Sequence, residues 1–529
     1  MNISFLNKLY IGQVIFFVLL VLGIIPREVA TVFAVFLTGY FIFAKTEDSV
    51  IFFVRSIPLF VAIPIIDGFD NFNTWRILSL VVFIKWLYES GNLKEILSLR
   101  IIKKIPLLAL NFRKTDFAWI NYILIISALS MILAPDKMLA LKRMIYFINL
   151  SLIGIVIYYL VQKNIGFLNR IIKNITVPTI IVIIVGFMQL VLTYFIDIYQ
   201  FMAFWGEGIQ CRQFGQEWCD IAVWLGNTWF AYYGEQLSLR MFSLFPDSHS
   251  FPIFVLLGLP ALLAISIRKL TADPERYDSL KKMIKTRVSL NIVWVALGLL
   301  AGILSGTRGI WAASVGVLII IACVIWWNRK INTDINHKNI FKYLASYMSV
   351  FFMLFIIAWP IFVSPQFLLS KGNWNLLSGR IKSIVDFGET SNSQRLTIWD
   401  ATVKSIYKKP LLGVGIGNYP VILNQDLFLS RAGSSAHNLY LHIAGEIGII
   451  GGLITIWFLW LLFIRSWQAF IKTKDPLNIT YFAGTIIFLP WVLIYSLTDV
   501  AIFDERAFSL FIISAALIFS QKKTDHYAR

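Results

Sequence analysis

Long apolar segments separated by short polar ones follow one another along almost the whole sequence of 529 residues. Most are roughly 17 to 25 residues long, the length that an α-helix needs to cross the hydrocarbon core of a bilayer. The pattern predicts about fourteen transmembrane helices, and hence an all-α, polytopic integral membrane protein. The predicted helices lie near residues 10–26, 28–44, 49–66, 75–91, 116–134, 139–162, 174–198, 249–267, 288–306, 309–327, 342–363, 437–464, 479–498 and 506–521.

The third of these segments, 49–66, is the least regular. Arg55, Pro58 and Pro64 interrupt its apolar residues. Proline removes a backbone donor from a helix, and irregular backbone inside a bilayer is tolerated only where other protein groups surround it. A broken or re-entrant segment therefore competes with a complete crossing.

The composition agrees with a membrane protein, because 58% of the residues are hydrophobic and only 14% are charged. A soluble domain of this length would need far more polar surface. Lysine and arginine number 47, against 29 aspartate and glutamate residues. In a soluble protein this excess would suggest a nucleic-acid partner. Here the basic residues lie mainly in short loops between apolar segments, so we expect membrane lipids, and no nucleic acid, among the partners.

The basic loops predict the orientation of the chain, because short loops rich in lysine and arginine stay on the cytoplasmic side. Because successive helices cross the membrane in opposite directions, all of these loops fall on the same side, which places both termini in the cytoplasm. The first apolar segment has no cleavage site of small residues, so we expect it to remain as a helix. The basic loops are 93–114, 163–173, 268–287, 328–342, 465–474 and 521–529, and the two largest polar segments on the opposite, exoplasmic face are 199–248 and 364–436.

This alternation also divides the chain into regions. The predicted regions are an N-terminal transmembrane bundle, 1–198; an exoplasmic loop, 199–248; a transmembrane helix with a cytoplasmic loop, 249–287; a region 288–465 that includes the exoplasmic loop 364–436; and C-terminal transmembrane helices, 466–529.

Three cysteines are too few for a disulfide framework. Cys211 and Cys219 nevertheless lie eight residues apart in the first exoplasmic loop, which the orientation places in an oxidising compartment. A disulfide between them and a pair of free thiols both remain open.

The segment "SSAHNLYLHIAGEIGIIGG" (434–452) places polar residues at the start of a predicted transmembrane helix. His437 and Asn438 would lie at the exoplasmic surface, and Gly448 and Gly451 about three turns below, where small residues let a neighbouring helix approach closely. An interfacial histidine with structural glycines is one interpretation of this pattern. A functional histidine, in a helix start that Ser434, Ser435 and Asn438 can cap, is the other.

Several arginines lie on the exoplasmic side, where the orientation rule disfavours them. Arg308 stands in the very short connection "LSGTRGIW" (304–311), Arg240 in "LRMFSLFPDSHSF", and Arg380 and Arg395 in the second large loop. Snorkelling from a helix end would explain one such residue. A guanidinium also pairs bidentately with phosphate and stays charged, so several of them beside one histidine indicate a diphosphate site.

The residues that carry these arginines and the histidine resemble the bacterial O-antigen ligase and O-antigen polymerase family. The resemblance covers roughly residues 290–465, through "LSGTRGIW", "SQRLTIWDATVKSIYKKPLLGVGIGNYP" and "AHNLYLHIAGEIGIIGG" in this order. Outside that region "RMFSLFPDSHSFP" (240–252) is also similar to the family.

The resemblance implies a metal-independent membrane glycosyltransferase of the GT-C type. Its donor would be a saccharide on undecaprenyl diphosphate, its acceptor a hydroxyl of a glycan, lipid or protein, and its place the exoplasmic face of the bacterial plasma membrane. A glycosyl diphosphate carries its own leaving group, so no cofactor is expected. In this family one histidine and two arginines are regarded as essential, and by position these are His437, Arg308 and Arg395, with Arg380 as a rival for the third. The residues expected to bind substrate are Arg240, Arg380, His249 and Asn438.

Other polar residues receive weaker interpretations. Asp247 and His249 could join His437 around a metal ion, but no ligand spacing supports a metal site. His442 follows His437 by five positions, about 140° around a helix, and is expected to face a neighbouring helix instead. Glu446 and Asp499, near membrane depth, are candidates for either a functional or a structural acid. The glycine-rich segment "GVGIGN" (413–418) follows no strand and is expected to form a turn.

Two alternatives to ligation remain. Polymerisation of lipid-linked repeat units is chemically the same step with a different acceptor. A polysaccharide or lipid transporter would also have many spans and buried charges, but transporters usually bind near the bilayer midplane between related halves. Here the unusual residues collect at one surface, which favours a transferase.

Overall fold

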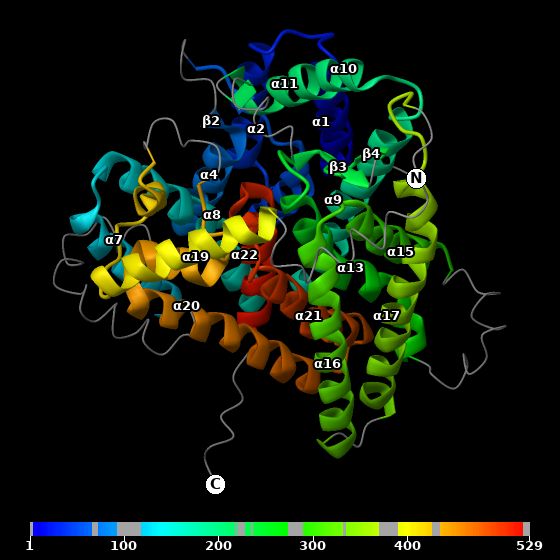
Figure 1. Ribbon diagram of the computed structural model, residues 1–529. Coiled ribbons are helices and arrows are strands. Elements are labelled where there is room, and N and C mark those ends of the chain that lie inside the picture. Colours follow the sequence, from blue (N-terminus) through cyan, green and yellow to red (C-terminus); the bar gives the residue numbers. More distant parts are fainter. Residues whose placement is uncertain are drawn as a thin grey trace.

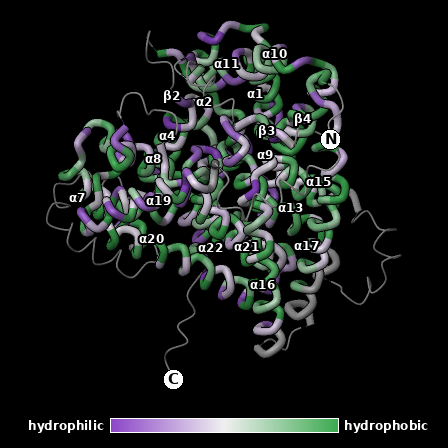
Figure 2. The backbone as a smooth tube through the Cα atoms, in the orientation of Figure 1, coloured by the Kyte–Doolittle hydropathy of each residue, from purple (hydrophilic) through white to green (hydrophobic). Residues whose placement is uncertain are grey.

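The computed structural model describes residues 4–65, 72–91, 118–216, 218–219, 228–233, 236–272, 289–331, 335–369, 390–425 and 434–521. Helices make up most of this part of the chain, with two short antiparallel hairpins (Figure 1). Hydrophobic colours predominate along the bundle in Figure 2. The prediction of an all-α polytopic membrane protein is confirmed.

The first half of the chain contains the following elements: α1 (Phe5–Val21), α2 (Val29–Phe43), α3 (Thr46–Ser56), η1 (Ile57–Leu59), β1 (Ala62–Ile63), β2 (Phe72–Asn73), α4 (Thr74–Glu89), α7 (Ala118–Ser130), η2 (Met131–Leu133), α8 (Lys137–Lys163), α9 (Ile165–Leu192), α10 (Ile198–Phe201), the π-helix η3 (Met202–Gln210), α11 (Cys211–Phe214), β3 (Phe230–Tyr233) and β4 (Gln236–Leu239).

The second half contains α13 (Ser250–Ala272), α15 (Ser289–Leu304), α16 (Arg308–Ile331), α17 (Ile335–Phe362), α19 (Thr390–Lys408), η7 (Tyr419–Leu423), α20 (Leu439–Lys472), α21 (Pro476–Tyr495), η8 (Ala501–Phe503) and α22 (Glu505–Phe519).

Within the described residues, seven helical segments are long and apolar enough to cross a membrane: 137–163, 165–192, 250–268, 308–328, 344–362, 439–472 and 476–495. Four shorter apolar helices accompany them: 5–21, 29–43, 119–133 and 292–304. The total of fourteen crossings and the GT-C comparison stay predictions.

Residues 49–66 do not form one long helix, because α3 ends at Ser56 and the 3₁₀ turn η1 carries Pro58. The structure therefore agrees with a broken segment and not with one complete helix at this position.

Helices α13 and α21 form the centre of the bundle, and both are buried along almost their whole length. Small residues allow their close approach. A Cβ atom on Gly484 of α21 would lie only 3.0 Å from Cα of Pro260 in α13, which is tighter than ordinary van der Waals contact. This packing fixes the ends of the two helices relative to each other, and the candidate site lies at one of those ends.

Contacts between segments that are distant in the sequence join helix ends at two opposite levels of the bundle. At one level Arg212 donates to Val21 O (2.9 Å), and the Asn73 amide donates to Glu505 Oε1 (2.7 Å). At the other level Arg170 pairs with Glu47, in the region where the sequence places cytoplasmic loops. These contacts join helix ends within each level, and the orientation of the chain in the membrane stays a prediction.

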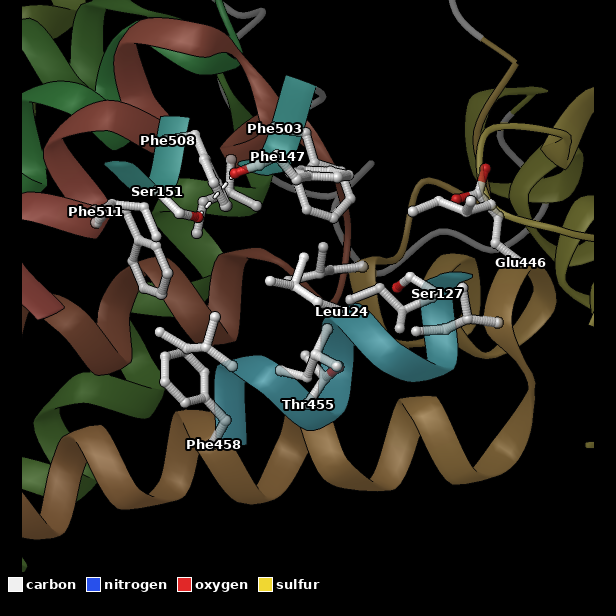
Figure 3. A pocket seen from close by; sticks show the side chains of 18 of the residues that line it. Leu124, Ser127, Phe147, Ser151, Glu446, Thr455, Phe458, Phe503, Phe508 and Phe511 are labelled. Carbon is white, nitrogen blue, oxygen red and sulfur yellow. Dashed lines mark hydrogen bonds between the residues drawn. The ribbon is translucent and has the colours of Figure 1, made fainter. Parts of the chain in front are cut away.

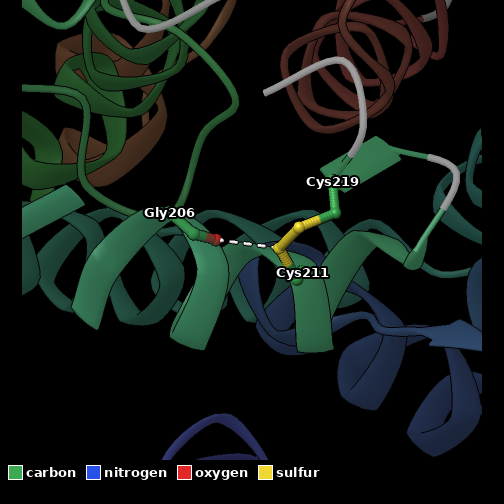
Figure 4. Close-up of a disulfide and its surroundings, with 3 residues drawn as sticks. All are labelled: Gly206, Cys211 and Cys219. Atoms are coloured by element: carbon green, nitrogen blue, oxygen red, sulfur yellow. Dashed lines mark hydrogen bonds between the residues drawn. A yellow bond between two sulfur atoms is a disulfide. The ribbon is translucent and has the colours of Figure 1, made fainter. Parts of the chain in front are cut away.

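The structure joins Cys211 and Cys219 in a disulfide, with their Cα atoms 4.9 Å apart (Figure 4). Cys211 begins the short helix α11, and its Sγ lies 3.2 Å from Gly206 O of the preceding π-helix. The disulfide thus closes a small loop next to α1. Of the two possibilities left open by the sequence, a disulfide and two free thiols, the structure contains the disulfide.

Helix α20 is broken near its start. Gly448 has φ 80° and ψ 172°, which is not helical, although the chain continues as a helix on both sides. The carbonyl of Leu411 lies against this glycine, so a side chain there would collide with backbone. Gly448 does allow the expected close packing, but its neighbour is the loop after α19 and the helix departs from regular geometry.

Candidate functional site

A polar cavity of about 460 Å³ lies where α13, α16, α19, α20 and α21 begin or end. The hairpin β3–β4 closes one side of it, with Phe230 paired to Leu239. Its lining residues are Thr228, Phe230, Ala231, Tyr232, Arg240, His249, Gly306, Thr307, Arg308, Gly309, Arg395, His437, Tyr495, Thr498 and Asp499.

Five of the seven residues proposed from the sequence line this one cavity: Arg240, His249, Arg308, Arg395 and His437. They come from segments as far apart as residues 240 and 437, so only the fold brings them together. Three guanidinium groups, against the one carboxylate of Asp499, leave this cavity positively charged.

The other two proposed residues are placed differently. Arg380 lies outside the described residues. Asn438 does not line the cavity. Its side-chain oxygen caps α20 by accepting hydrogen bonds from the backbone N–H groups of Tyr440 (3.0 Å) and Leu441 (3.1 Å). This cap fixes the start of the helix directly after His437.

Arg240 is held by the backbone on both sides of the cavity. Its own N–H donates to Trp229 O (2.7 Å), which continues the β3–β4 hairpin. Its guanidinium contacts Ser305 O and Thr307 Oγ1, each at 3.3 Å, in the connection between α15 and α16. Arg240 therefore links the hairpin to the connection that carries Arg308.

His249 stands one residue before α13, in a turn that Asp247 shapes. The carboxylate of Asp247 accepts hydrogen bonds from the N–H groups of His249 and Ser250, both at 2.8 Å. The imidazole is engaged on both sides, because Nδ1 lies 2.8 Å from Asp499 Oδ2 and Nε2 lies 3.3 Å from Arg240 Nη2. Nδ1 therefore faces a carboxylate and Nε2 faces a guanidinium group, so both ring nitrogens have partners within the protein.

Asp499 uses both of its oxygens in this network. Oδ1 accepts from the N–H groups of Val500 (2.7 Å) and Ala501 (3.0 Å), while Oδ2 meets His249. Burial alone would raise the pKa of this carboxyl group, but His249, with smaller effects of His437 and Arg395, more than offsets burial and lowers it. Asp499 is therefore a carboxylate at neutral pH.

His437 is the residue directly before the cap of α20, and its backbone has φ 45°. Histidine tolerates this left-handed conformation better than most residues. The ring Nδ1 is buried and has no hydrogen-bond partner among the described residues. Burial lowers the pKa of His437, and Arg395 and His249 lower it further, while Asp499 opposes them. The imidazole is thus neutral at neutral pH and able to accept a proton.

Arg308 and Arg395 enter the cavity from two different helices. Arg308 is the first residue of α16, and the next residue, Gly309, packs so closely against Tyr495 and Thr498 that a side chain there would collide with both. Arg395 belongs to α19, which Trp399 ties to the segment before His437 through a hydrogen bond from Nε1 to Ala436 O (2.8 Å). Both arginines are half-buried.

Reasoning from the sequence missed several cavity residues. Thr307, Tyr495 and Thr498 carry no signal of their own, since each is an ordinary polar residue near a helix end. The sequence marks Asp499 only as an acid near membrane depth. Helix α19 lies inside the segment 364–436, which the sequence predicts to be a loop, although its buried and half-buried positions at 395, 398, 399, 401, 402, 405 and 406 form one face of a helix.

His442 and Glu446 lie away from the polar cavity. The His442 ring stacks on Tyr419, with ring centroids 4.5 Å apart, and its Nε2 lies 3.5 Å from Glu446 Oε1. The expectation that His442 faces a neighbouring element agrees with this placement. The "GVGIGN" segment forms turns with positive φ at Gly413, Gly415 and Gly417, and it packs against the first part of α20.

A second cavity, which is apolar, lies between α7, α8, α20 and α22 (Figure 3). Leu439 lines it, two residues after His437, and so do Ile502 and Phe503, which follow Asp499 closely. The same two chain segments therefore border a polar cavity on one side and an apolar cavity on the other.

Within the described residues no three histidine, cysteine, aspartate or glutamate side chains are placed to hold a metal ion.

The fold and the cavity together define a polytopic membrane protein with a cationic site at one end of its helices. Residues 293–456 match the family described as O-antigen ligase, which confirms the resemblance found in the sequence. This part of the chain is therefore similar to the O-antigen ligase family. No curated protein matches the chain.

Proposed function

We propose that this protein transfers a saccharide chain from undecaprenyl diphosphate to an acceptor hydroxyl at the exoplasmic face of the plasma membrane. The observation that supports this best is the meeting of Arg240, Arg308, Arg395 and His437 around one cavity within or beside the part of the chain that matches the O-antigen ligase family. This match implies a membrane enzyme of the ligase or polymerase type that acts on lipid-linked glycans.

In the proposed reaction the acceptor oxygen attacks the anomeric carbon of the donor. A new C–O bond forms as the bond between that carbon and the diphosphate oxygen breaks, and the diphosphate leaves with the bonding electrons. Arg308 and Arg395 stabilise the growing negative charge on the leaving group, because guanidinium groups pair bidentately with phosphate oxygens. The attack from the opposite side would invert the anomeric configuration.

His437 accepts the proton of the acceptor hydroxyl. A general base must be uncharged before it acts and must reach the reacting oxygen. Burial keeps the imidazole neutral by lowering its pKa, so the ring can take up a proton from the acceptor. His249 is less suited to this role, because Asp499 and Arg240 already occupy both of its ring nitrogens.

The apolar cavity supports a donor that carries a hydrocarbon chain. Leu439 and Ile502, which are close in sequence to His437 and Asp499, line this apolar cavity together with Phe147, Phe458 and Phe508 (Figure 3). Burying CH₂ groups there is favourable by about 0.8 kcal/mol each. The two adjoining cavities thus match the polar and apolar parts of a lipid-linked saccharide.

The test is to incubate the purified protein with a defined undecaprenyl diphosphate saccharide and candidate acceptors, and to follow the release of undecaprenyl diphosphate. Release that depends on an acceptor supports the proposal, and the product distinguishes ligation onto a lipid or protein from polymerisation. Movement of the intact donor across vesicles, without release of the diphosphate, would support the transporter alternative instead. Because arginines supply the charge stabilisation, added chelator should leave the release rate unchanged.

A further inference from the structure

A separate polar cavity of about 630 Å³ lies among α1, α2, α3 and α9. It includes Arg170 and Asn174, near the start of α9. Gln189, near the other end of α9, accepts hydrogen bonds from the backbone of Phe242 and Ser243 close to Arg240. The 19 residues between Arg170 and Gln189 span roughly 28 Å at about 1.5 Å per helical residue. The second cavity is therefore remote from the proposed transferase site.

Arg55, in α3, supplies a charge to this cavity that no carboxylate neutralises. Its Nε donates to Asn174 Oδ1 (2.5 Å), and its Nη1 donates to Asn7 Oδ1 (2.7 Å). Both acceptors are neutral amides. Among the described residues no aspartate or glutamate lies within ion-pair distance of this guanidinium. A half-buried charge with only neutral partners retains its attraction for an anion.

The other charged residues leave the cavity positive. Arg170 pairs with Glu47 (2.5 Å) and Asp48 (2.8 Å), so these three residues together carry a net charge of −1, and the two cations Lys45 and Arg55 bring the total to +1. Lys45 lines the cavity, is exposed, and has no side-chain partner within the described part of the chain. Lys45 and Arg55 are therefore the two charges that an incoming anion would meet.

The rim of the cavity is apolar. Phe5 and Phe43 both line it, and their side chains are 66% and 89% exposed. Such exposure of large apolar side chains is usual where lipid covers the protein. A ligand that satisfies both the cations inside and the aromatic rim must be amphiphilic, with an anionic head and a hydrocarbon body.

The position of the cavity fits a lipid of the cytoplasmic leaflet. It lies at the level of the basic segment 163–173, which the charge pattern places in the cytoplasm. Basic pockets between transmembrane helices on this side are known to hold anionic lipid headgroups. We propose that this cavity binds the phosphodiester headgroup of an anionic glycerophospholipid, with Arg55 and Lys45 on the phosphate and Phe5 and Phe43 along the acyl chains.

Native mass spectrometry of the full-length protein, titrated with phosphatidylglycerol and separately with phosphatidylcholine, tests the proposal. We expect preferential retention of phosphatidylglycerol. The change Arg55→Gln should weaken this retention roughly tenfold, the effect of losing one charge-assisted hydrogen bond. Lys45→Gln, at an exposed position that folding does not depend on, should weaken it in the same direction. Lys163→Gln removes a like charge at the same level but outside the cavity, and it should leave retention unchanged.

Equal retention of the two lipids would overturn the proposal, and so would wild-type retention of phosphatidylglycerol in Lys45→Gln and Arg55→Gln. If Arg55→Gln does not fold, Lys45→Gln decides alone. A competition with millimolar inorganic phosphate completes the experiment. If it displaces phosphatidylglycerol completely, the cavity is a site for soluble phosphate and the lipid assignment fails, whereas lipid retained in its presence supports the assignment.

Discussion

His249 Nδ1 lies 2.8 Å from Asp499 Oδ2, across 250 residues of sequence. The same imidazole reaches Arg240 through Nε2 at 3.3 Å, so a carboxylate, a histidine and an arginine form a continuous row along the cavity wall. The row orients Arg240 toward the cavity and keeps one charged acid beside His437. We infer that Asp499 and His249 position other groups, while His437 and the arginines meet the substrate.

This inference predicts the effect of Asp499→Asn. The amide keeps the shape of the side chain and can still accept from Val500 and Ala501, but it removes the charge that holds His249. We expect kcat to fall by about 10- to 100-fold, the equivalent of one hydrogen bond to a charged group, while the protein stays folded. Steady-state release of undecaprenyl diphosphate measures this. An unchanged kcat would show that the row is only structural packing.

The pH dependence follows from the lowered pKa of His437. As the pH falls, protonation of this imidazole removes the base, so activity should decline through an acid limb placed below the ordinary histidine value of about 6.5. Asp499 acts to raise this pKa, so in Asp499→Asn the acid limb should move to still lower pH. Profiles of kcat/KM for both proteins test the prediction. A limb that moves upward in the variant would contradict it.

Arg308 and Arg395 should not tolerate lysine. Lysine keeps the charge but loses the planar fork that pairs with a diphosphate, so Arg308→Lys and Arg395→Lys should each lower kcat/KM by roughly 10- to 100-fold. Arg212→Lys is a matched control, because Arg212 lies at the same level, contacts a backbone carbonyl and does not line the cavity. Wild-type turnover in both cavity variants would remove their assigned role. If activity is lost only in Arg380→Lys, the role passes to that residue.

The disulfide between Cys211 and Cys219 should be detectable as one linked pair. Mass spectrometry after alkylation without reduction should recover the two residues in a cross-linked peptide, while Cys323 is alkylated. Replacing both with serine removes a constraint on a short loop, which lowers the free energy of unfolding by about 2–3 kcal/mol. A measured melting temperature should fall accordingly. Recovery of Cys211 and Cys219 as separate alkylated thiols would contradict the structure.

The fold class and most residues of the candidate site could be predicted from the sequence, because both depend on strong local signals. Long apolar segments define the helices, and arginines on the exoplasmic side are conspicuous because the orientation rule disfavours them. The pairing of His249 with Asp499 could not be predicted, since it depends on how α13 packs against α21. Helix α19 was missed because its polar composition resembles that of a loop. The break of α20 at Gly448 depends on the backbone of Leu411, which no local pattern reveals.

The most direct test of the account is the turnover of His437→Ala on a defined undecaprenyl diphosphate saccharide with its correct acceptor. As a general base His437 should contribute about 10²- to 10⁴-fold, so the variant should remain folded and membrane-embedded while release of undecaprenyl diphosphate falls by that factor. His442→Ala, compared per amount of folded protein, should cost far less, because His442 lies outside the polar cavity. Retention of most of the activity in His437→Ala, or a greater loss in His442→Ala, would contradict the central claim.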